Sequence, residues 1–412
     1  MMKPQDYITL ENQYGAHNYH PIPVVLSRGE GVFVWDVEGK RYYDFLSAYS
    51  AVNQGHCHPR IIEALVSQAH KLTLTSRAFY NDQLGLFEKK LHDIFGYDMA
   101  LPMNTGAEAV ETAFKLSRKW GYEIKGIEEN KARIIFFESN FHGRTMGAIS
   151  ASTEESSTKG FGPYLPGLVV LPYGDLEAAK EYLTTQKNIA SIIIEPIQGE
   201  AGVIIPPDGY LKSLSEICKQ QNILFIADEI QTGLGRTGKM LACDHYDLKP
   251  DVVLLGKAIS GGTMPVSVVL ANKQVMEVIK PGQHGSTYGG NPLAARVSCV
   301  ALNVLLDEHL IQNAAAVGGQ LTDLLLEIKN DSTGLIKTIR GKGLLQAIEI
   351  DDSPESDTAW NICMRMAKDG VLAKPTRGNI IRLAPPLVID KQQIEESADI
   401  IRQVMMLHMS IA

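Results

Sequence analysis

The chain has 412 residues, of which 45% are hydrophobic and 21% charged, the composition of an ordinary globular protein. Its 39 Lys and Arg residues against 47 Asp and Glu give a formal net charge of −8, which argues against a surface for nucleic acid or anionic membrane. No apolar stretch approaches the roughly 20 residues of a membrane span. At this length two domains are expected rather than one core.

The N-terminus has neither the apolar core of a signal peptide nor the Arg/Ser bias of a transit peptide. The five cysteines are scattered and form no Cys-x-x-Cys pair, which suits a reducing compartment better than a disulfide framework. We therefore expect a cytoplasmic protein. His56-Cys57-His58 resembles a metal cluster only superficially, because neighbouring ligands rarely share one ion, so no metal site is expected.

The pattern of apolar runs divides the chain into consecutive parts. Residues 1–50 predict an N-terminal arm that packs with a small domain and contains a strand pair turning at residues 37–40. Residues 51–290 alternate helix and strand, which predicts an α/β large domain that binds the cofactor, with a mostly parallel sheet flanked by helices. Residues 291–330 are apolar at helical spacing and predict one long connecting helix, followed by a small α+β C-terminal domain at 331–412.

Individual elements are predicted from short apolar runs. In the large domain the candidate strands are 133–137, 168–171, 191–195, 223–228, 251–255 and 265–270. In the small domain they are 336–343, 344–350 and 379–383, with helices at 359–369 and from Asp390 onward.

A carboxylate and a lysine stand at the ends of two of the apolar runs, where Asp228 closes the first run and Lys257 follows the second. Such runs are typical of strands buried on both faces of a parallel sheet, and ligands bind beyond the carboxyl ends of these strands. A lysine there can form an imine, and an acid can keep a pyridinium nitrogen protonated, which is what pyridoxal phosphate needs. Glu229 is expected on the opposite face from Asp228. A solvated acid and a surface lysine remain the alternatives.

Three further segments carry polar groups where strands meet helices or loops. Thr105 and Glu108 form a capping-box pattern, and the N–H groups that follow, near Gly106 and Ala107, suit a phosphate. After the run 133–137, an aromatic pair can stack on a flat ring and an arginine can fork onto a carboxylate. The run 191–195 ends on a glutamate, and its loop carries a second one. These five residues are the pair Phe141 and His142, then Arg144, Glu195 and the loop glutamate Glu200. A hydrogen-bonded core histidine is an equally good interpretation of His142.

The segment 233–239 points elsewhere, because it matches both Gly-x-Gly-x-x-Gly and the first seven positions of a P-loop. A P-loop requires Ser or Thr after its lysine, and this chain has Met240. No apolar strand lies directly upstream. We interpret the segment as a flexible loop, with a nucleotide-binding switch as the alternative outside cofactor chemistry.

Together with the segments 14–19, 50–56, 72–80 and 284–292, these motifs resemble the class III, fold-type I pyridoxal-phosphate aminotransferases over nearly the whole chain. Within that family, the similarity is greatest to the ornithine aminotransferase group. The resemblance implies the family's fold and a homodimer, or a higher oligomer, with shared active sites.

The resemblance also assigns roles in holding pyridoxal 5′-phosphate. Lys257 would be the Schiff-base lysine and Asp228 the partner of the pyridine nitrogen. The remaining cofactor-binding residues would be Gln231 at the phenolic oxygen, Phe141 or His142 over the ring, Glu195 beside them, and Gly106, Ala107 and the neighbouring subunit's Thr287 at the phosphate.

For the substrates, the resemblance implies transfer of the δ-amino group of L-ornithine to 2-oxoglutarate. The products would be L-glutamate and glutamate 5-semialdehyde, which cyclises to pyrroline-5-carboxylate, in either proline biosynthesis or arginine degradation. Arg144 and Tyr19 would bind the carboxylate far from the reacting nitrogen, and Arg382 the α-carboxylate of glutamate. Glu200 would silence that arginine when ornithine binds, and Tyr49 would exclude the wrong binding mode. Acetylornithine and 4-aminobutyrate aminotransferases are the alternatives, which Tyr19 and Tyr49 would discriminate.

Overall fold

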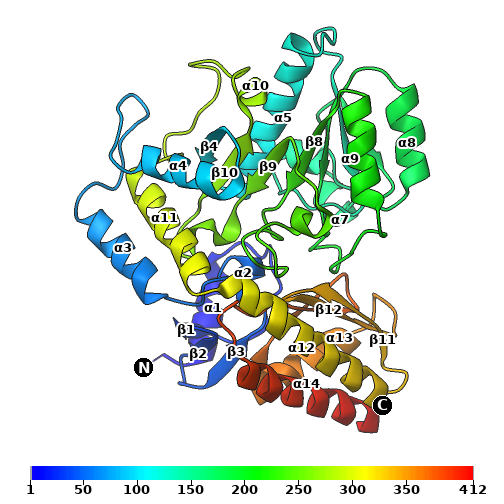
Figure 1. Ribbon diagram of the computed structural model, residues 1–412. Helices are drawn as coiled ribbons and strands as arrows, with labels where there is room; N and C mark the ends of the chain where they lie inside the picture. The colour runs from blue at the N-terminus through cyan, green and yellow to red at the C-terminus, as the bar shows by residue number, and fades with distance from the viewer. Residues whose placement is uncertain (1, 412) are drawn as a thin grey trace.

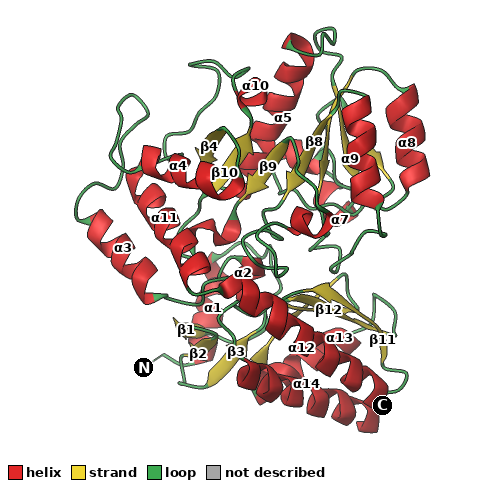
Figure 2. Cartoon of the chain, in the orientation of Figure 1, coloured by secondary structure: helices red, strands yellow, loops and turns green. Residues whose placement is uncertain are grey.

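The computed structural model describes residues 2–411 and consists of one large sheet wrapped by helices, with two smaller sheets beside it (Figures 1 and 2). In Figure 1 the large sheet fills the upper part of the molecule, and the smaller sheets lie below it. The helices α11 and α12 run from one part to the other. The predicted α/β fold is therefore confirmed, whereas the exact domain boundaries stay a prediction.

The large sheet has seven strands and lies mostly parallel, as predicted. The strand β10 pairs antiparallel with β4 and β9, whereas the pairs β9–β8, β8–β7, β7–β5 and β5–β6 are parallel. In sheet order the strands are β4 (Met99–Met103), β10 (Ser267–Ala271), β9 (Val252–Leu255), β8 (Leu224–Asp228), β7 (Ile189–Ile194), β5 (Arg133–Phe137) and β6 (Leu168–Leu171).

The sequence analysis missed β4, the edge strand. Pro102 interrupts its apolar run, and a proline inside a run argues against a strand because it cannot donate a ladder hydrogen bond. The strand forms because β4 has only β10 as a neighbour, so a missing donor on its open side costs little.

Both faces of the large sheet are buried, which is why its strands are continuous apolar runs. Along β8, Leu224 and Ile226 join the core formed with α5 (Gly106–Glu123), while Phe225 and Ala227 join the core formed with α8 and α9 on the other face. Since helices cover both faces, ligands are expected at the carboxyl ends of the strands.

The other helices follow the predicted alternation. They are α1 (Pro4–Tyr14), α2 (Ser47–Ser50), α3 (Pro59–Ala69), α4 (Leu84–Phe95), α6 (Met146–Ile149), α7 (Glu155–Thr158), α8 (Leu176–Thr185), α9 (Tyr210–Gln220), α10 (Lys273–Met276), α11 (Pro292–Asp307), α12 (Leu310–Asp331), α13 (Thr358–Asp369) and α14 (Lys391–Ile411), with 3₁₀ turns η1 (Ala242–Tyr246) and η2 (Lys257–Ser260). Within residues 2–411 none of the helices has the length and apolar character needed to span a membrane.

One small sheet joins the two ends of the chain. Its strands are β1 (Leu26–Glu30), β2 (Phe33–Asp36), β3 (Arg41–Asp44) and β13 (Val371–Leu372). The predicted turn lies between β2 and β3, and β13 pairs parallel with β3, so the N-terminal arm shares a sheet with the C-terminal region. The other small sheet is antiparallel, in the order β11 (Ile336–Lys342), β12 (Leu345–Ile350), β15 (Ile380–Leu383) and β14 (Lys374–Thr376).

The single long helix predicted over 291–330 is wrong, because α11 and α12 are separate helices. The chain breaks at Glu308 and His309, and His309 takes a left-handed φ of 53°. Glu308 accepts hydrogen bonds from His58 and Arg60, which precede and begin α3. Apolar spacing continues through the break, so periodicity alone could not reveal an interruption that distant side chains fix.

The prediction of a flexible loop at 233–239 is also wrong, because the loop is buried almost throughout. Arg236 is fully buried and donates to the carbonyl of Leu344 at 2.9 Å, the carbonyl of Pro385 at 2.5 Å and Oδ1 of Asn53 at 2.6 Å. These acceptors come from three distant segments. The glycines therefore let a structural arginine tie the two parts of the molecule together.

Replacing this arginine is expected to destabilise the protein. Arg236→Ala leaves three acceptors without their donor and opens a cavity, so the free energy of unfolding should fall by about 3–5 kcal/mol in equilibrium urea denaturation. The control is Lys239→Ala in the same loop, whose exposed side chain predicts a change within about 0.5 kcal/mol. Equal effects of the two substitutions would contradict this role of Arg236.

Candidate active site

A cavity of about 220 Å³ opens where β8 and β9 end, near the start of α5. Of the residues predicted to be catalytic or to bind the cofactor, all but Thr287 line it. The lining residues are Gly106, Ala107, Phe141, His142, Gly143, Glu195, Asp228, Ile230, Gln231, Thr232 and Lys257. The structure thus brings together residues from five separate segments of the sequence.

Lys257 is the first residue of η2 and is separated from the end of β9 by Gly256 alone. Its φ of 46° is left-handed, a conformation that costs a non-glycine residue about 1–2 kcal/mol and that is concentrated at functional sites. Burial lowers the pKa of its ammonium group, although the carboxylates of Glu200 and Asp228 oppose this shift. A neutral amine, the nucleophilic form, is therefore easier to reach at this position.

Asp228 ends β8 and is buried against a histidine. Its Oδ2 lies 2.6 Å from Nδ1 of His142, and its Oδ1 accepts from the backbone N–H of Ile230 at 3.1 Å. Burial opposes the charged form of His142, but the hydrogen bond and charge of Asp228 outweigh it and raise the pKa of the imidazole. Glu229 has different partners, the hydroxyl of Thr232 and two backbone N–H groups, so the two acids point apart as predicted.

The pairing of His142 with Asp228 was not predicted. The side chain of His142 is fully buried, and its Nε2 has no hydrogen-bond partner among the described residues. It therefore combines the two interpretations of the sequence, since it is a hydrogen-bonded core histidine that also lines the cavity. Its 2.6 Å contact with Asp228 orients the carboxylate.

The start of α5 forms one wall of the cavity. Thr105 accepts from the backbone N–H of Glu108, and the Glu108 carboxylate accepts from the N–H of Thr105, which confirms the predicted capping box. The first turn of a helix carries N–H groups without intrahelical partners and a partial positive charge. With Gly106 and Ala107 at this turn, the wall is suited to a phosphate.

Glu195 stands at the back of the cavity, after β7. Its carboxylate accepts from the N–H of Phe141 at 2.8 Å and from the N–H of Gly199 at 3.3 Å. Burial raises the pKa of Glu195 from 4.5 to about 7, and the nearby Asp228 adds to the rise while His142 opposes it. The carboxyl group therefore fixes the loop that carries Phe141.

Glu200 and Arg382 form an ion pair at 2.7 Å, as the family resemblance implied. Arg382 comes from β15 of the small antiparallel sheet and is almost fully buried. Gln231 joins the pair by donating to Glu200 at 2.9 Å, and its Oε1 lies 3.5 Å from Nη1 of Arg382. Burial opposes ionisation of Glu200, but Arg382 outweighs it and lowers the pKa of the carboxyl group.

An unusual turn holds Tyr49 against this pair. The φ angles of residues 47–50 are all positive and lie between 46° and 69°. Left-handed conformations in four consecutive non-glycine residues are strained, so surrounding contacts must impose them. The guanidinium of Arg382 lies 5.1 Å from the centre of the Tyr49 ring. Burial raises the pKa of the Tyr49 phenol, and Glu200 adds to this rise. No residue pattern in this segment predicts the turn.

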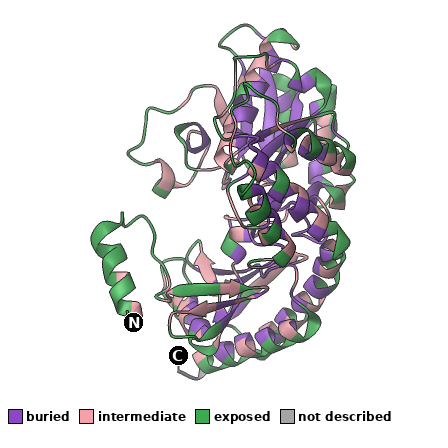
Figure 3. Ribbon diagram, turned by 90° about the vertical axis from the view of Figure 1, so that its left-hand side faces the viewer, coloured by how far each residue is buried: buried purple, intermediate pink, exposed green. Residues whose placement is uncertain are grey.

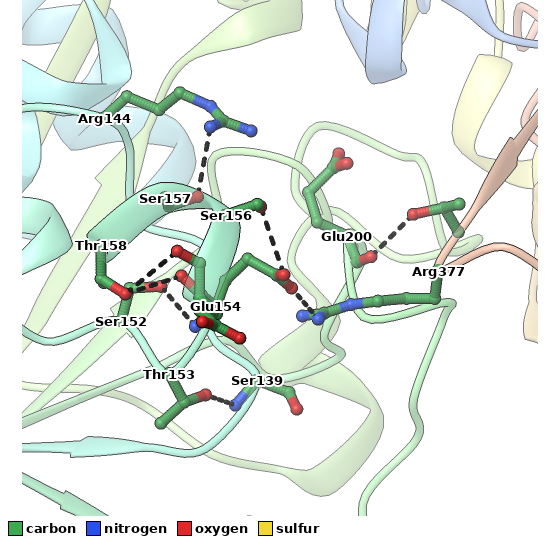
Figure 4. Close-up of polar contacts among 12 residues, drawn as sticks. Ser139, Arg144, Ser152, Thr153, Glu154, Ser156, Ser157, Thr158, Glu200 and Arg377 are labelled. Atoms are coloured by element: carbon green, nitrogen blue, oxygen red, sulfur yellow. Dashed lines mark hydrogen bonds and ion pairs between the residues drawn. The ribbon is translucent and has the colours of Figure 1, made fainter. Parts of the chain in front are cut away.

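Two further cavities contain the remaining substrate candidates. Arg144 lines an outer cavity of about 280 Å³ and donates to the hydroxyl of Ser157 at 3.2 Å (Figure 4). Tyr19 is 68% exposed and lines a separate cavity of about 430 Å³ beside Tyr49. Thr287 is exposed and lies outside the cofactor cavity.

Sequence reasoning missed two charged residues at the outer cavity, Glu154 and Arg377. They are 223 positions apart and form an ion pair. Nothing in their local sequences marks them, because only the folded chain brings them together.

Comparison with known proteins agrees with this geometry. The model of the class-III aminotransferases matches residues 14–405. The chain belongs to the class-III aminotransferase family. It is 57% identical over 396 residues to the mitochondrial ornithine aminotransferase of Drosophila melanogaster, covering 96% of this chain and 90% of that protein. It is 54% identical to the ornithine aminotransferase of Plasmodium falciparum isolate 3D7, covering 96% and 95%.

Solved structures of the family match over almost all of the chain. The ornithine aminotransferase of Toxoplasma gondii has a TM-score of 0.97 at 45% identity and covers 100% of this chain and 97% of its own. An acetylornithine aminotransferase from Elizabethkingia anophelis has a TM-score of 0.91 at 55% identity, with 99% and 100% covered. Both substrate groups named in the sequence analysis are thus found among similar proteins.

The raised pKa of Glu195 predicts a pH-dependent stability. Because the folded protein holds this proton more tightly than the unfolded chain, the contribution is largest below pH 4.5 and is lost as the pH rises to about 7. The free energy of unfolding of the wild type, relative to Glu195→Gln, should fall by roughly 2–3 kcal/mol across this range. Urea denaturation of both proteins at several pH values measures it, and a constant difference would contradict the assignment.

Proposed function

We propose that the protein transfers the δ-amino group of L-ornithine to 2-oxoglutarate, with pyridoxal 5′-phosphate as cofactor. The products are L-glutamate and glutamate 5-semialdehyde. The observation that carries this proposal is the buried Glu200–Arg382 ion pair beside the cavity that contains Lys257 and Asp228. The relatives named ornithine aminotransferase support the same substrate.

The cavity residues fit this cofactor. The start of α5 suits its phosphate, Asp228 its pyridine nitrogen and Lys257 its aldehyde carbon. When bound, pyridoxal phosphate supplies an electron sink for the C–H bond that breaks next to the reacting nitrogen. Phe141 and Gln231 line the cavity, where Phe141 would cover the ring and Gln231 would bind its phenolic oxygen.

Two residues of the chain control the protons of the reaction. Asp228 would keep the proton on the pyridine nitrogen, and His142 would orient Asp228 through its 2.6 Å contact. Lys257 would move a proton between the reacting carbon of the substrate and the C4′ carbon of the cofactor. Burial lowers the pKa of its ammonium group, which favours the neutral amine that can act as this base.

The Glu200–Arg382 pair explains how one pocket accepts two different substrates. Ornithine entering with its δ-amine brings no carboxylate to Arg382, so the arginine stays paired with Glu200. Glutamate entering with its α-amine brings a carboxylate that replaces Glu200. Leaving one member of a buried pair without a partner costs roughly 3–5 kcal/mol, so the pair opens only for an incoming carboxylate.

At the far end, Arg144 and Tyr19 bind the carboxylate that is distant from the reacting nitrogen, and Tyr49 excludes the reversed orientation. Tyr49 lies over Arg382, while its phenol is also influenced by Tyr19 and Arg144, which supports these assignments. A solved acetylornithine aminotransferase is 55% identical to this chain, but the relatives named ornithine aminotransferase favour L-ornithine as the substrate.

We also propose a homodimer with shared active sites, in the cytoplasm. Thr287 is on an exposed loop outside the cavity of its own chain, which suits donation to a neighbour's phosphate site. Phe79 and Tyr80 are 71% and 104% exposed, as expected where a second subunit covers them. We divide each subunit at the boundaries that the sequence predicted, with the connecting helix replaced by α11 and α12.

The visible absorbance of the purified protein tests the proposed function. The holoenzyme should be yellow, and addition of L-ornithine should move the absorption band to the near-ultraviolet. Addition of 2-oxoglutarate should restore it. A band that responds to acetylornithine or 4-aminobutyrate but not to ornithine would replace the substrate, and a protein that stays colourless with added cofactor would refute the proposal.

A further inference from the structure

The outer cavity contains a charged pair that the roles described above leave unused. Glu154 precedes α7 and pairs with Arg377, which lies in the turn between β14 and β15 (Figure 4). Both side chains are about one-third exposed, at 32% and 33%. Figure 4 shows the Arg377 side chain reaching toward Glu154, with Arg144 beyond Ser157.

This pair stands at the entrance of the reaction site. The outer cavity and the cofactor cavity share Phe141, His142 and Gly143 in their walls, so the two are adjacent. The segment of Arg377 is also joined to the Glu200–Arg382 pair, because the hydroxyl of the neighbouring Thr376 donates to the backbone carbonyl of Glu200 at 2.9 Å. In the buried-to-exposed view of Figure 3, the small sheet presents intermediate and exposed residues at its margin.

The two substrates carry different charges at the third carbon from the reacting one. In ornithine bound for δ-transfer, that carbon bears both a carboxylate and an ammonium group. In glutamate bound for α-transfer, that carbon is itself the carboxylate. The outer cavity must therefore hold a zwitterion in one half-reaction and a lone anion in the other.

We propose that Glu154 and Arg377 determine specificity at this outer end, each serving one substrate. Glu154 accepts the α-ammonium group of ornithine while Arg144 holds its carboxylate. Arg377 joins Arg144 in binding the distal carboxylate of glutamate and 2-oxoglutarate. This inference rests on the proposed function and assigns two residues that its inner switch does not include.

Because both side chains of the pair are about one-third exposed, this exchange has a low free-energy cost. Partly solvated ion pairs contribute little net stability, so a substrate group can take over one partner at low cost. The Glu200–Arg382 pair behaves differently, because the Arg382 side chain is only 3% exposed and loses Glu200 only when another carboxylate takes its place. The inner pair thus selects between substrates, and the outer pair adapts to both.

Half-reaction kinetics of the holoenzyme test the inference with 5-aminopentanoate, which is ornithine without its α-amino group. In Glu154→Gln, the preference for ornithine over 5-aminopentanoate should fall about tenfold, and the rate constant with glutamate should be unchanged or higher. In Arg377→Gln, the rate constant with glutamate should fall about tenfold, and the preference for ornithine should be kept. Cofactor absorbance gives all of these rate constants.

Glu155→Gln is the matched control, because Glu155 is 75% exposed and pairs with Lys159 outside the cavity lining. Glu155→Gln should leave unchanged both the preference for ornithine over 5-aminopentanoate and the rate constant with glutamate. The ratio of two substrates on one variant cancels any loss of folded enzyme. If both variants lower ornithine, 5-aminopentanoate and glutamate rates equally, the pair only closes the entrance and the inference is overturned. A wild type that fails to respond to ornithine would instead refute the proposed function.

Discussion

The ion pair between Glu200 and Arg382 is the constraint on which the rest of the account depends. It joins the loop after β7 of the large sheet to β15 of the small antiparallel sheet, so it requires both parts of the molecule. Desolvation makes either charge alone costly, and Gln231 adds a third polar group to the cluster. In the proposed mechanism a substrate carboxylate replaces Glu200, so Arg382 is never left buried without a charged partner.

The large sheet explains why the catalytic groups meet beside this pair. Helices bury both of its faces, which leaves the carboxyl ends of β8 and β9 as the place where polar groups can converge. Asp228 and Lys257 occupy those ends. His142 contacts the Asp228 carboxylate and orients it, while burial lowers the pKa of the Lys257 amine and so favours its neutral, basic form.

The sequence was sufficient to predict all strands of the large sheet except β4, and most of the cavity wall. Asp228 and Lys257 follow long apolar runs, and Thr105 opens a capping box, so local pattern and structure agree at these positions. The roles of individual site residues, however, came from the family resemblance and stay predictions.

What the sequence could not show are the features that distant residues impose. The break at His309 depends on contacts of Glu308 with α3, and the left-handed turn around Tyr49 depends on packing that overrides local preference. The glycine-rich segment is typical of a flexible loop, yet acceptors from three other segments bury Arg236 within it. The Glu154–Arg377 pair spans more than half of the chain and has no local signal.

The central claim, that the inner pair selects which nitrogen of ornithine reacts, is tested most directly by isotope transfer. Ornithine labelled with ¹⁵N at either the α or the δ position is incubated with 2-oxoglutarate and the holoenzyme, and the glutamate formed is analysed by mass spectrometry. The account predicts that only the δ label enters glutamate in the wild type, and that Glu200→Ala admits the α label as well. Transfer of the α label by the wild type, or an unchanged δ preference in Glu200→Ala, would contradict it.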